Sequence, residues 1–158
     1  MTDTTAAFPD HSHAAPGELV ALIDQQIDLY ATLDELSKRQ HSIVETDDTD
    51  ALLRVLADRQ DVIARISGLA ASLAPFRADW DANINRLDED ERARIRRRLA
   101  DLAVVMEQIA RRDEHDRDVI EQRRSSISAE IGGAKRSGAA MQAYGGQPKG
   151  PRFQDRDA

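Results

Sequence analysis

The sequence predicts an all-α protein: a long antiparallel helical hairpin or three-helix coiled-coil bundle with disordered N- and C-terminal tails. Apolar residues recur at alternating spacings of three and four in three stretches, which keeps one stripe of each helix against a partner. The 158 residues include only three Phe, two Tyr and one Trp, so we expect a narrow, aliphatic core. Charged residues make up 32%, which is typical of helices with solvated outer faces.

The first helix is expected from Glu18 to Glu45. Residues 1–17 are small and polar and contain two prolines, so they predict a disordered arm. The stripe of the first helix comprises Leu19, Leu22, Gln26, Leu29, Leu33, Leu36, Gln40 and Ile43. Gln26 and Gln40 either specify how the helices align, at some cost in stability, or lie at the wetter edge of the seam, and both explanations fit the sequence.

A short acidic segment, residues 46–50, separates the first helix from the second. Asp48 or Thr49 is available there as an N-cap. A connection this short forces the second helix back antiparallel against the first. The second helix is expected from Asp50 to at least Ala74. Its stripe comprises Leu52, Leu56, Arg59, Ile63, Ile66, Ala70 and Leu73.

Pro75 makes the end of the second helix ambiguous. A proline inside a helix costs about 3 kcal/mol and kinks or ends it. An apolar spacing of 4-4-3 nevertheless continues beyond it, at Phe76, Trp80, Ile84 and Leu87. We therefore expect a kinked helix that reaches about Asn85, in preference to a clean stop at the proline.

The third helix is expected from Glu89 to Ile131. Asp88 and Glu91 have the spacing of a capping box at its start, and Gly132-Gly133 has the composition of a left-handed stop. Its stripe comprises Ile95, Leu99, Leu102, Met106, Ile109, Asp113, Asp116, Ile120, Arg123 and Ile127. The domain organisation expected is thus an arm (1–17), a coiled-coil domain (18–131) and a flexible, partner-binding tail (132–158).

The predicted helices differ in length. The third, at about 43 residues, outruns the first, at about 28, by roughly 22 Å at about 1.5 Å per residue. Apolar surface outside a complete three-helix cross-section marks a dimer seam, a partner groove or an unstable overhang. The mismatch therefore favours a binding function.

Charge and composition exclude several classes of function. The net charge of −7 disfavours nucleic-acid binding, and acidic neighbours flank the basic cluster, so we expect a solvated face with local ion pairs. That cluster comprises Arg92, Arg94, Arg96, Arg97 and Arg98. The absence of cysteine excludes thiolate chemistry and fits a reducing compartment. With neither a signal peptide nor a membrane-length apolar run, we expect a cytoplasmic protein without stable membrane insertion.

The run Asp113-Glu114-His115-Asp116 is the candidate metal-ligand cluster, since it offers carboxylates and an imidazole. However, helix bundles that hold two metal ions use Glu-x-x-His motifs, and this chain contains none. We therefore expect no metal and no other cofactor. Asp113 and Asp116 are instead expected to interrupt the apolar seam and to pair with neighbouring arginines on the same helix. Those arginines are Arg111, Arg112 and Arg117.

No catalytic site is expected. His11 and His13 lie in the arm, which cannot hold a catalytic geometry, and His41 stands alone on the first helix. No Ser–His–Asp set has positioned support. In the tail, Tyr144 and Phe153 are two aromatic residues in a polar segment; they either anchor the tail on a partner or are incidental.

The organisation of the chain from about residue 18 resembles the FlgN family of flagellar type III export chaperones. The resemblance rests on the long first helix, the acidic turn, Leu52-x-x-x-Leu56-x-x-Arg59-Gln60, the long third helix, and Tyr144-Gly145 in a polar tail that contains Asp155. One feature departs from the family, which often carries Asn-x-x-Asn in the middle of the third helix, where this chain has Asp113-x-x-Asp116.

The resemblance implies a cytoplasmic chaperone that binds the helical terminal regions of hook-associated proteins and delivers them to the export gate. It also implies that the C-terminal part engages the client. We expect helix-in-groove pairing on the third helix, with the tail closing over the client. The predicted contact residues are Val119, Ile120, Ile127, Ile131, Tyr144 and Phe153. The alternative is a structural coiled-coil adaptor that oligomerises, as a homodimer, through its exposed stripe.

Overall fold

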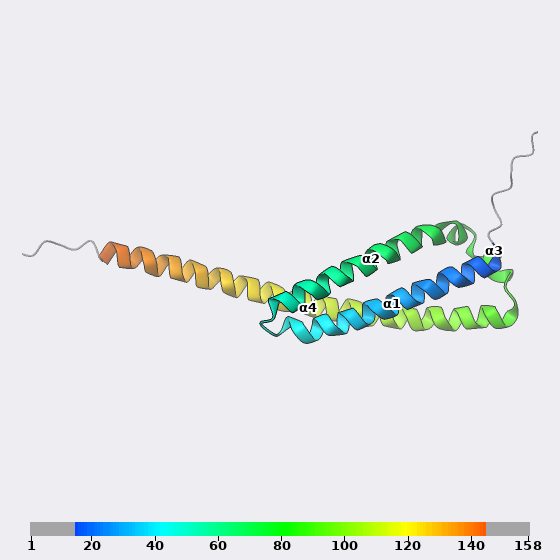
Figure 1. Cartoon of the computed structure of the whole chain (residues 1–158), viewed down its shortest axis with the longest axis horizontal. Helices are drawn as coiled ribbons and strands as arrows, with labels where there is room; N and C mark the ends of the chain where they lie inside the picture. Colours follow the sequence, from blue (N-terminus) through cyan, green and yellow to red (C-terminus); the bar gives the residue numbers. More distant parts are fainter. Residues whose placement is uncertain (1–14, 145–158) are drawn as a thin grey trace, which may run out of the picture. The chain divides into compact units, whose positions relative to one another are not determined.

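The computed structural model describes residues 15–144, which form four helices and, within that range, no strand. These are α1 (Pro16–Val44), α2 (Thr49–Ala78), α3 (Trp80–Asn85) and α4 (Glu89–Tyr144) (Figure 1). The all-α prediction of about three long helices packed together is confirmed. The chain divides into two units, residues 1–117 and 118–158, and α4 begins in the first and ends in the second.

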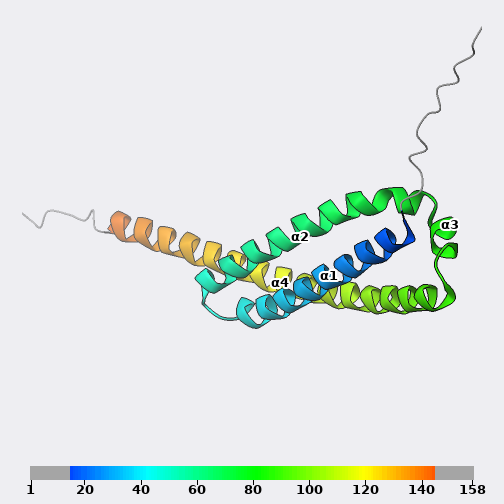
Figure 2. The ribbon, with the colours of Figure 1, turned by 45° about the vertical axis from the view of Figure 1, so that its right-hand side comes forward.

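The helix α1 begins two residues before the predicted start. Pro16 occupies the first turn, where its missing N–H costs no intrahelical hydrogen bond and its fixed φ suits the helix. The connection to α2 is as short as expected, and Asp48 is the N-cap, with its Oδ1 accepting from the backbone N–H of Ala51 at 2.9 Å. The chain reverses there, and α2 runs back antiparallel to α1 (Figure 2).

Pro75 lies inside α2 and does not end it. The prediction of one kinked helix reaching Asn85 was nevertheless wrong, because α2 ends at Ala78 and Asp79 leaves the helical conformation with φ −137° and ψ 56°. Phe76 and Ile84, on either side of this break, belong to the same core cluster. The Nδ2 of Asn83 donates to the carbonyls of Phe76 (3.1 Å) and Asp79 (2.9 Å), which satisfies two groups at the break.

The first unit contains two apolar core clusters. One lies where the start of α1, the end of α2, α3 and the start of α4 meet, and comprises Leu19, Ile23, Leu73, Phe76, Ile84, Leu87 and Ile95. The other joins the middle of α1, α2 and α4, and comprises Leu33, Leu36, Val55, Val62 and Ile109. Eleven of these twelve side chains are aliphatic, as the scarcity of aromatic residues predicted.

The start of α4 is as predicted, since Asp88 Oδ1 accepts from the backbone N–H of Glu91 at 2.8 Å. Its predicted end was wrong: α4 continues through Gly132-Gly133 to Tyr144 and has 56 residues, against 29 in α1 and 30 in α2. No described glycine has a positive φ. Each glycine costs a helix about 1 kcal/mol relative to alanine, and the helix formers that follow, such as Ala134 and Lys135, offset part of this cost.

Residues 132–144, expected in a flexible tail, are thus helical. Most of the predicted arm (1–14) and the end of the predicted tail (145–158) lie outside the described residues. The described helices include none with the length and apolarity that a bilayer crossing requires.

Candidate functional site

Three isoleucines in the C-terminal part of α4 are exposed to solvent. The exposed fractions are 37% for Ile120, 56% for Ile127 and 52% for Ile131. Spacings of seven and eleven residues bring these side chains to within about 20° of the same direction on an α-helix. Val119 is half-buried and, one residue before Ile120, points about 100° away. The three isoleucines, which we call the isoleucine stripe, are therefore an apolar face, and Val119 is not part of it.

The isoleucine stripe continues a set of positions that is buried earlier in α4. Ile95, Leu102, Ile109 and Asp116 occupy the same helical face and are all buried. From Ile120 onward, the isoleucines that follow along α4 on roughly this face are exposed. A single sequence pattern thus serves as core in the first unit and as surface in the second.

The two aromatic residues predicted to bind a partner are not described at the level of side chains. Tyr144 is the last residue of α4, and its side chain lies outside what the structure describes. Phe153 lies outside the described residues altogether. The predicted closing of the tail over a client therefore stays a prediction.

The first unit also contains an apolar pocket of about 390 Å³ between α1, α4 and the end of α2. Its volume is at the low end of the range for small-molecule sites. Most of its lining is apolar, with polar groups from one glutamine and one arginine: Ile23, Gln26, Leu73, Arg77, Trp80, Leu99, Leu102, Ala103 and Met106. Gln26 is half-buried at this pocket, as expected for the wetter edge of the seam.

Buried and half-buried polar side chains join α4 to α1 and α2 around residues 112–116. Arg59 Nη2 donates to Asp113 Oδ2 at 2.6 Å, and Gln40 Nε2 donates to the buried Asp116 Oδ2 at 2.9 Å. Arg112 Nη2 donates to Asp34 Oδ1. We call these six residues, Asp34, Gln40, Arg59, Arg112, Asp113 and Asp116, the polar layer. Gln40 is therefore buried within the seam and hydrogen-bonded across it, so it does not lie at the wetter edge.

The prediction that Asp113 and Asp116 pair with arginines on their own helix was wrong. Asp113 pairs with Arg59 of α2, and Arg112 pairs with Asp34 of α1. Arg111 pairs with Glu107. The spacing along α4 allowed local pairs, but the partner helices bring charges closer.

The carboxyl group of Asp34 is held in its ionised form. Burial raises its pKa, but the hydrogen bonds from Lys38 and Arg112 lower it by more, so the pKa lies below the usual 3.8. The same contact with Asp34, together with Glu35, raises the pKa of Lys38 above 10.5. The Asp34–Arg112 pair is therefore an ion pair between α1 and α4 at neutral pH.

The predicted metal-ligand run does not converge as a set. Asp113 turns to Arg59 of α2, and Glu114 is exposed. His115 and Asp116 instead meet His41 of α1. The sequence held a signal for this third residue, since His41 directly follows Gln40, a polar residue on the stripe that faces the other helices.

The arginine cluster at the start of α4 forms ion pairs and backbone hydrogen bonds. Arg94 and Arg98 both pair with Asp24 of α1. Arg92 donates to the carbonyls of Asn85 and Leu87. The pairing was predicted, but with neighbours on the same helix rather than with α1.

In a comparison with known protein families, one family model matches this chain. The model of this family, described as FlgN protein, matches residues 16–149, a range that includes all four helices. A search of curated proteins and a search of solved structures gave no match.

Proposed function

Because this chain belongs to the FlgN family of flagellar export chaperones for hook-associated proteins, we propose that it binds a helical terminal region of such a client on α4. The family is non-enzymatic, so the function to explain is binding. We propose the isoleucine stripe as the contact surface, with Val119 at its margin. The observation that carries this assignment is the exposure of three large apolar side chains on one face.

The spacing of the stripe suits a helical partner. From Ile120 to Ile131 the stripe covers about 16 Å of helix axis at about 1.5 Å per residue, or about three turns. An amphipathic client helix lays anchors at i, i+3, i+4 and i+7 on such a face. Burying one isoleucine side chain contributes about 1.5–3 kcal/mol, from which the ordering of the client is subtracted.

We further propose that the chaperone acts in the cytoplasm, keeps its client from assembling early and passes it to export-gate components. The last residues of the chain are proposed to close over the bound helix through Tyr144 and Phe153. A chain that ends at residue 144 keeps all of α4 and loses Phe153, so it tests the closing segment separately from the helix.

The contact surface is tested by Ile127→Asp/Ile131→Asp in the full chain. The matched control is Ser125→Asp/Ala129→Asp, which adds the same two charges to exposed positions about 120–180° away from the three isoleucines on α4. Binding to the terminal segment of a hook-associated protein is measured by titration calorimetry. We expect the isoleucine variant to bind at least tenfold more weakly and the control to bind like the unaltered chain. Equal loss in both variants would count against the stripe.

The alternative function, a coiled-coil adaptor, predicts a different result. Sedimentation at several concentrations would then show a tight homodimer of the chain without client. The substitutions Ile127→Asp/Ile131→Asp would dissociate that dimer into monomers. A monomer that binds one client segment per chain favours the chaperone. The exposed stripe serves either partner, so only the assembly state separates the two functions.

A further inference from the structure

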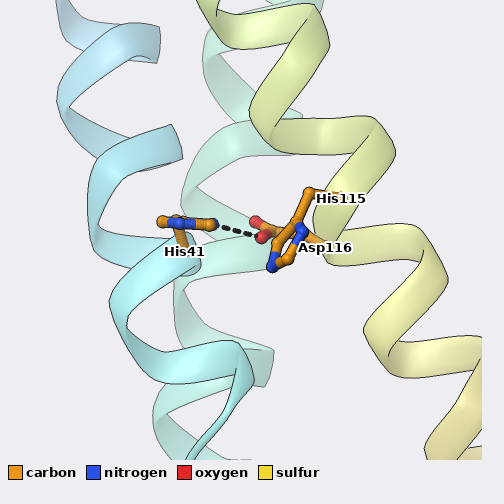
Figure 3. A group of neighbouring side chains, drawn as sticks. All are labelled: His41, His115 and Asp116. Atoms are coloured by element: carbon orange, nitrogen blue, oxygen red, sulfur yellow. Dashed lines mark hydrogen bonds and ion pairs between the residues drawn. The ribbon is translucent and has the colours of Figure 1, made fainter.

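Three potential metal ligands from two helices meet at the end of the first unit. His41 comes from the last turn of α1, and His115 and Asp116 are consecutive on α4 (Figure 3). One ligand atom from each lies within 4.8 Å of the other two. His41 Nδ1 is 2.6 Å from Asp116 Oδ1, and the two imidazole rings are 5.1 Å apart between centroids.

Asp116 is the member of this group whose side chain is held in place by burial and a hydrogen bond. None of its side chain is exposed, and its Oδ2 accepts a hydrogen bond from Gln40 Nε2, which leaves Oδ1 directed at His41. Metal-binding side chains are commonly oriented in this way by a hydrogen bond to their remaining polar atom. The carboxylate is therefore already held in a ligand-like orientation.

The charges around Asp116 differ from those around the other two carboxylates of the polar layer. Asp34 pairs with Arg112 and Asp113 pairs with Arg59, so each has a guanidinium as its counter-charge. Asp116 faces His41, whose imidazole is charged only when protonated. A cation close by stabilises a buried carboxylate. A metal ion bound to the imidazoles would supply it.

We propose that His41, His115 and Asp116 bind one divalent transition-metal ion, such as zinc, and thereby clamp α1 to α4. Two imidazole nitrogens and one carboxylate oxygen are a donor set that zinc accepts. Zinc–ligand distances of about 2.0–2.2 Å put neighbouring ligand atoms about 3.3 Å apart in a tetrahedron. The ligand atoms now lie within 4.8 Å of one another, so the half-exposed side chain of His115 has to rotate for the ion to bind.

The remaining coordination position is open to solvent. The side chain of His41 is 44% exposed and that of His115 is 52% exposed, so an ion and a water molecule have access. A Glu45 oxygen lies 3.7 Å from His115 Nε2 and can supply a fourth ligand or orient the ring. The site is independent of the isoleucine stripe, so it adds to the chaperone function without resting on it.

The test uses the full chain, freed of metal with a chelator and titrated with zinc in a calorimeter. We expect one zinc ion per chain and a higher unfolding temperature with zinc, because a ligand that binds only the folded state stabilises it. His115→Gln should bind zinc at least tenfold more weakly. The matched control is His11→Gln/His13→Gln, which removes the two histidines outside the cluster and should bind like the unaltered chain.

The proposal is overturned if the unaltered chain binds no zinc at micromolar concentration, if His115→Gln binds equally well, or if only the control variant loses binding. It is also overturned if magnesium competes at the same concentration, which would mean general attraction to an acidic chain. Should His115→Gln fold poorly, cobalt added to the unaltered chain gives a second readout. Visible absorption typical of tetrahedral nitrogen and oxygen ligation supports the site, and a spectrum of hydrated cobalt contradicts it.

Discussion

Asp116 shows how much one buried polar side chain of α4 contributes to the bundle. Its two carboxylate oxygens accept from Gln40 and contact His41, both on α1. Replacing Asp116 leaves Gln40 with a buried amide and no acceptor at that place. The cost of an unsatisfied buried group is usually larger than the net gain from making its hydrogen bond.

Asp116→Ala should lower the free energy of unfolding by about 1–3 kcal/mol, because it strands Gln40 and removes a packed side chain. Urea denaturation in the presence of a chelator measures this without any contribution from metal. Glu114→Ala, at an exposed position two residues earlier, should change stability by less than about 0.5 kcal/mol. Similar losses in the two variants would mean that burial of Asp116 is not what matters.

Asp34 gives the bundle a dependence on pH. Its pKa is lower in the folded chain than in the unfolded chain, so as the pH falls the unfolded chain takes up the proton first. The stabilisation is therefore complete well above the unfolded pKa of about 3.9 and is lost as the pH falls through the folded pKa.

Asp34→Asn should destabilise the chain by about 1–3 kcal/mol at neutral pH, since it breaks the charged contacts with Arg112 and Lys38. The difference between variant and unaltered chain should shrink as the pH is lowered below 3.8, the usual value for this group. Urea denaturation of both chains, from neutral pH to below pH 3.8, measures this difference in stability. Glu35→Gln, which touches only the exposed Lys38 contact, serves as the control. A difference that does not change with pH would contradict the ion pair.

At the scale of the element, α4 is notable because it continues through two consecutive glycines. Gly132 and Gly133 lie in the helix with ordinary negative φ, and a Cβ built at either position would meet nothing within 4 Å. Alanine would therefore fit both positions without a clash. The glycines make this part of α4 easier to unwind but do not end it.

Gly132→Ala/Gly133→Ala should raise the helicity of the chain and slow amide hydrogen exchange in residues 132–144. Each substitution should favour the helix by about 0.5–1 kcal/mol, because glycine loses more conformational freedom on folding. The result distinguishes a helix α4 that ends at Tyr144 from one that ends before Gly132. If the glycines formed a left-handed stop, alanine would be strained there, and neither helicity nor protection of these residues would rise.

The elements that sequence predicted well are those decided by neighbours in the chain. Asp88 was predicted as an N-cap and Asp48 as one of two candidates, because a carboxylate reaches a backbone N–H three residues on wherever a helix starts. The break at Asp79 was not, because the apolar spacing continues across it from Phe76 to Ile84. The partner of Asp113 was missed because Arg59 is 54 residues away in sequence.

The isoleucine stripe could be predicted because a heptad pattern persists whether or not anything covers it. Ile120, Ile127 and the earlier core positions obey the same spacing. The end of α1 and the start of α2, which limit the first unit at that side, were both predicted to within a residue. The group of His41, His115 and Asp116 required the pairing of two helices and was not predicted.

At the scale of the whole molecule, both apolar core clusters belong to the first unit. The described side chains of the second unit are exposed apart from a few, so they add little buried apolar area. Most of the folding free energy should therefore reside in residues 15–117.

A chain that ends at residue 124 should unfold cooperatively, with a urea midpoint and m-value close to those of the full chain, because the surface buried on folding is nearly unchanged. Binding of a hook-associated client should be lost, since Ile127 and Ile131 are absent. Circular dichroism and the calorimetric assay measure the two properties. A large fall in the urea midpoint would show that the second unit supports the first.

The contact between Arg59 and Asp113 also fixes the axial position of α2 relative to α4. The leucine ladders repeat every seven residues, so apolar matching alone would accept an axial slip of about 10.5 Å. After such a slip Arg59 would sit level with Met106 or Ile120, and a buried guanidinium without its carboxylate costs about 3–5 kcal/mol. One ion pair thus sets the axial offset between α2 and α4, which the repeating apolar side chains alone would leave undetermined.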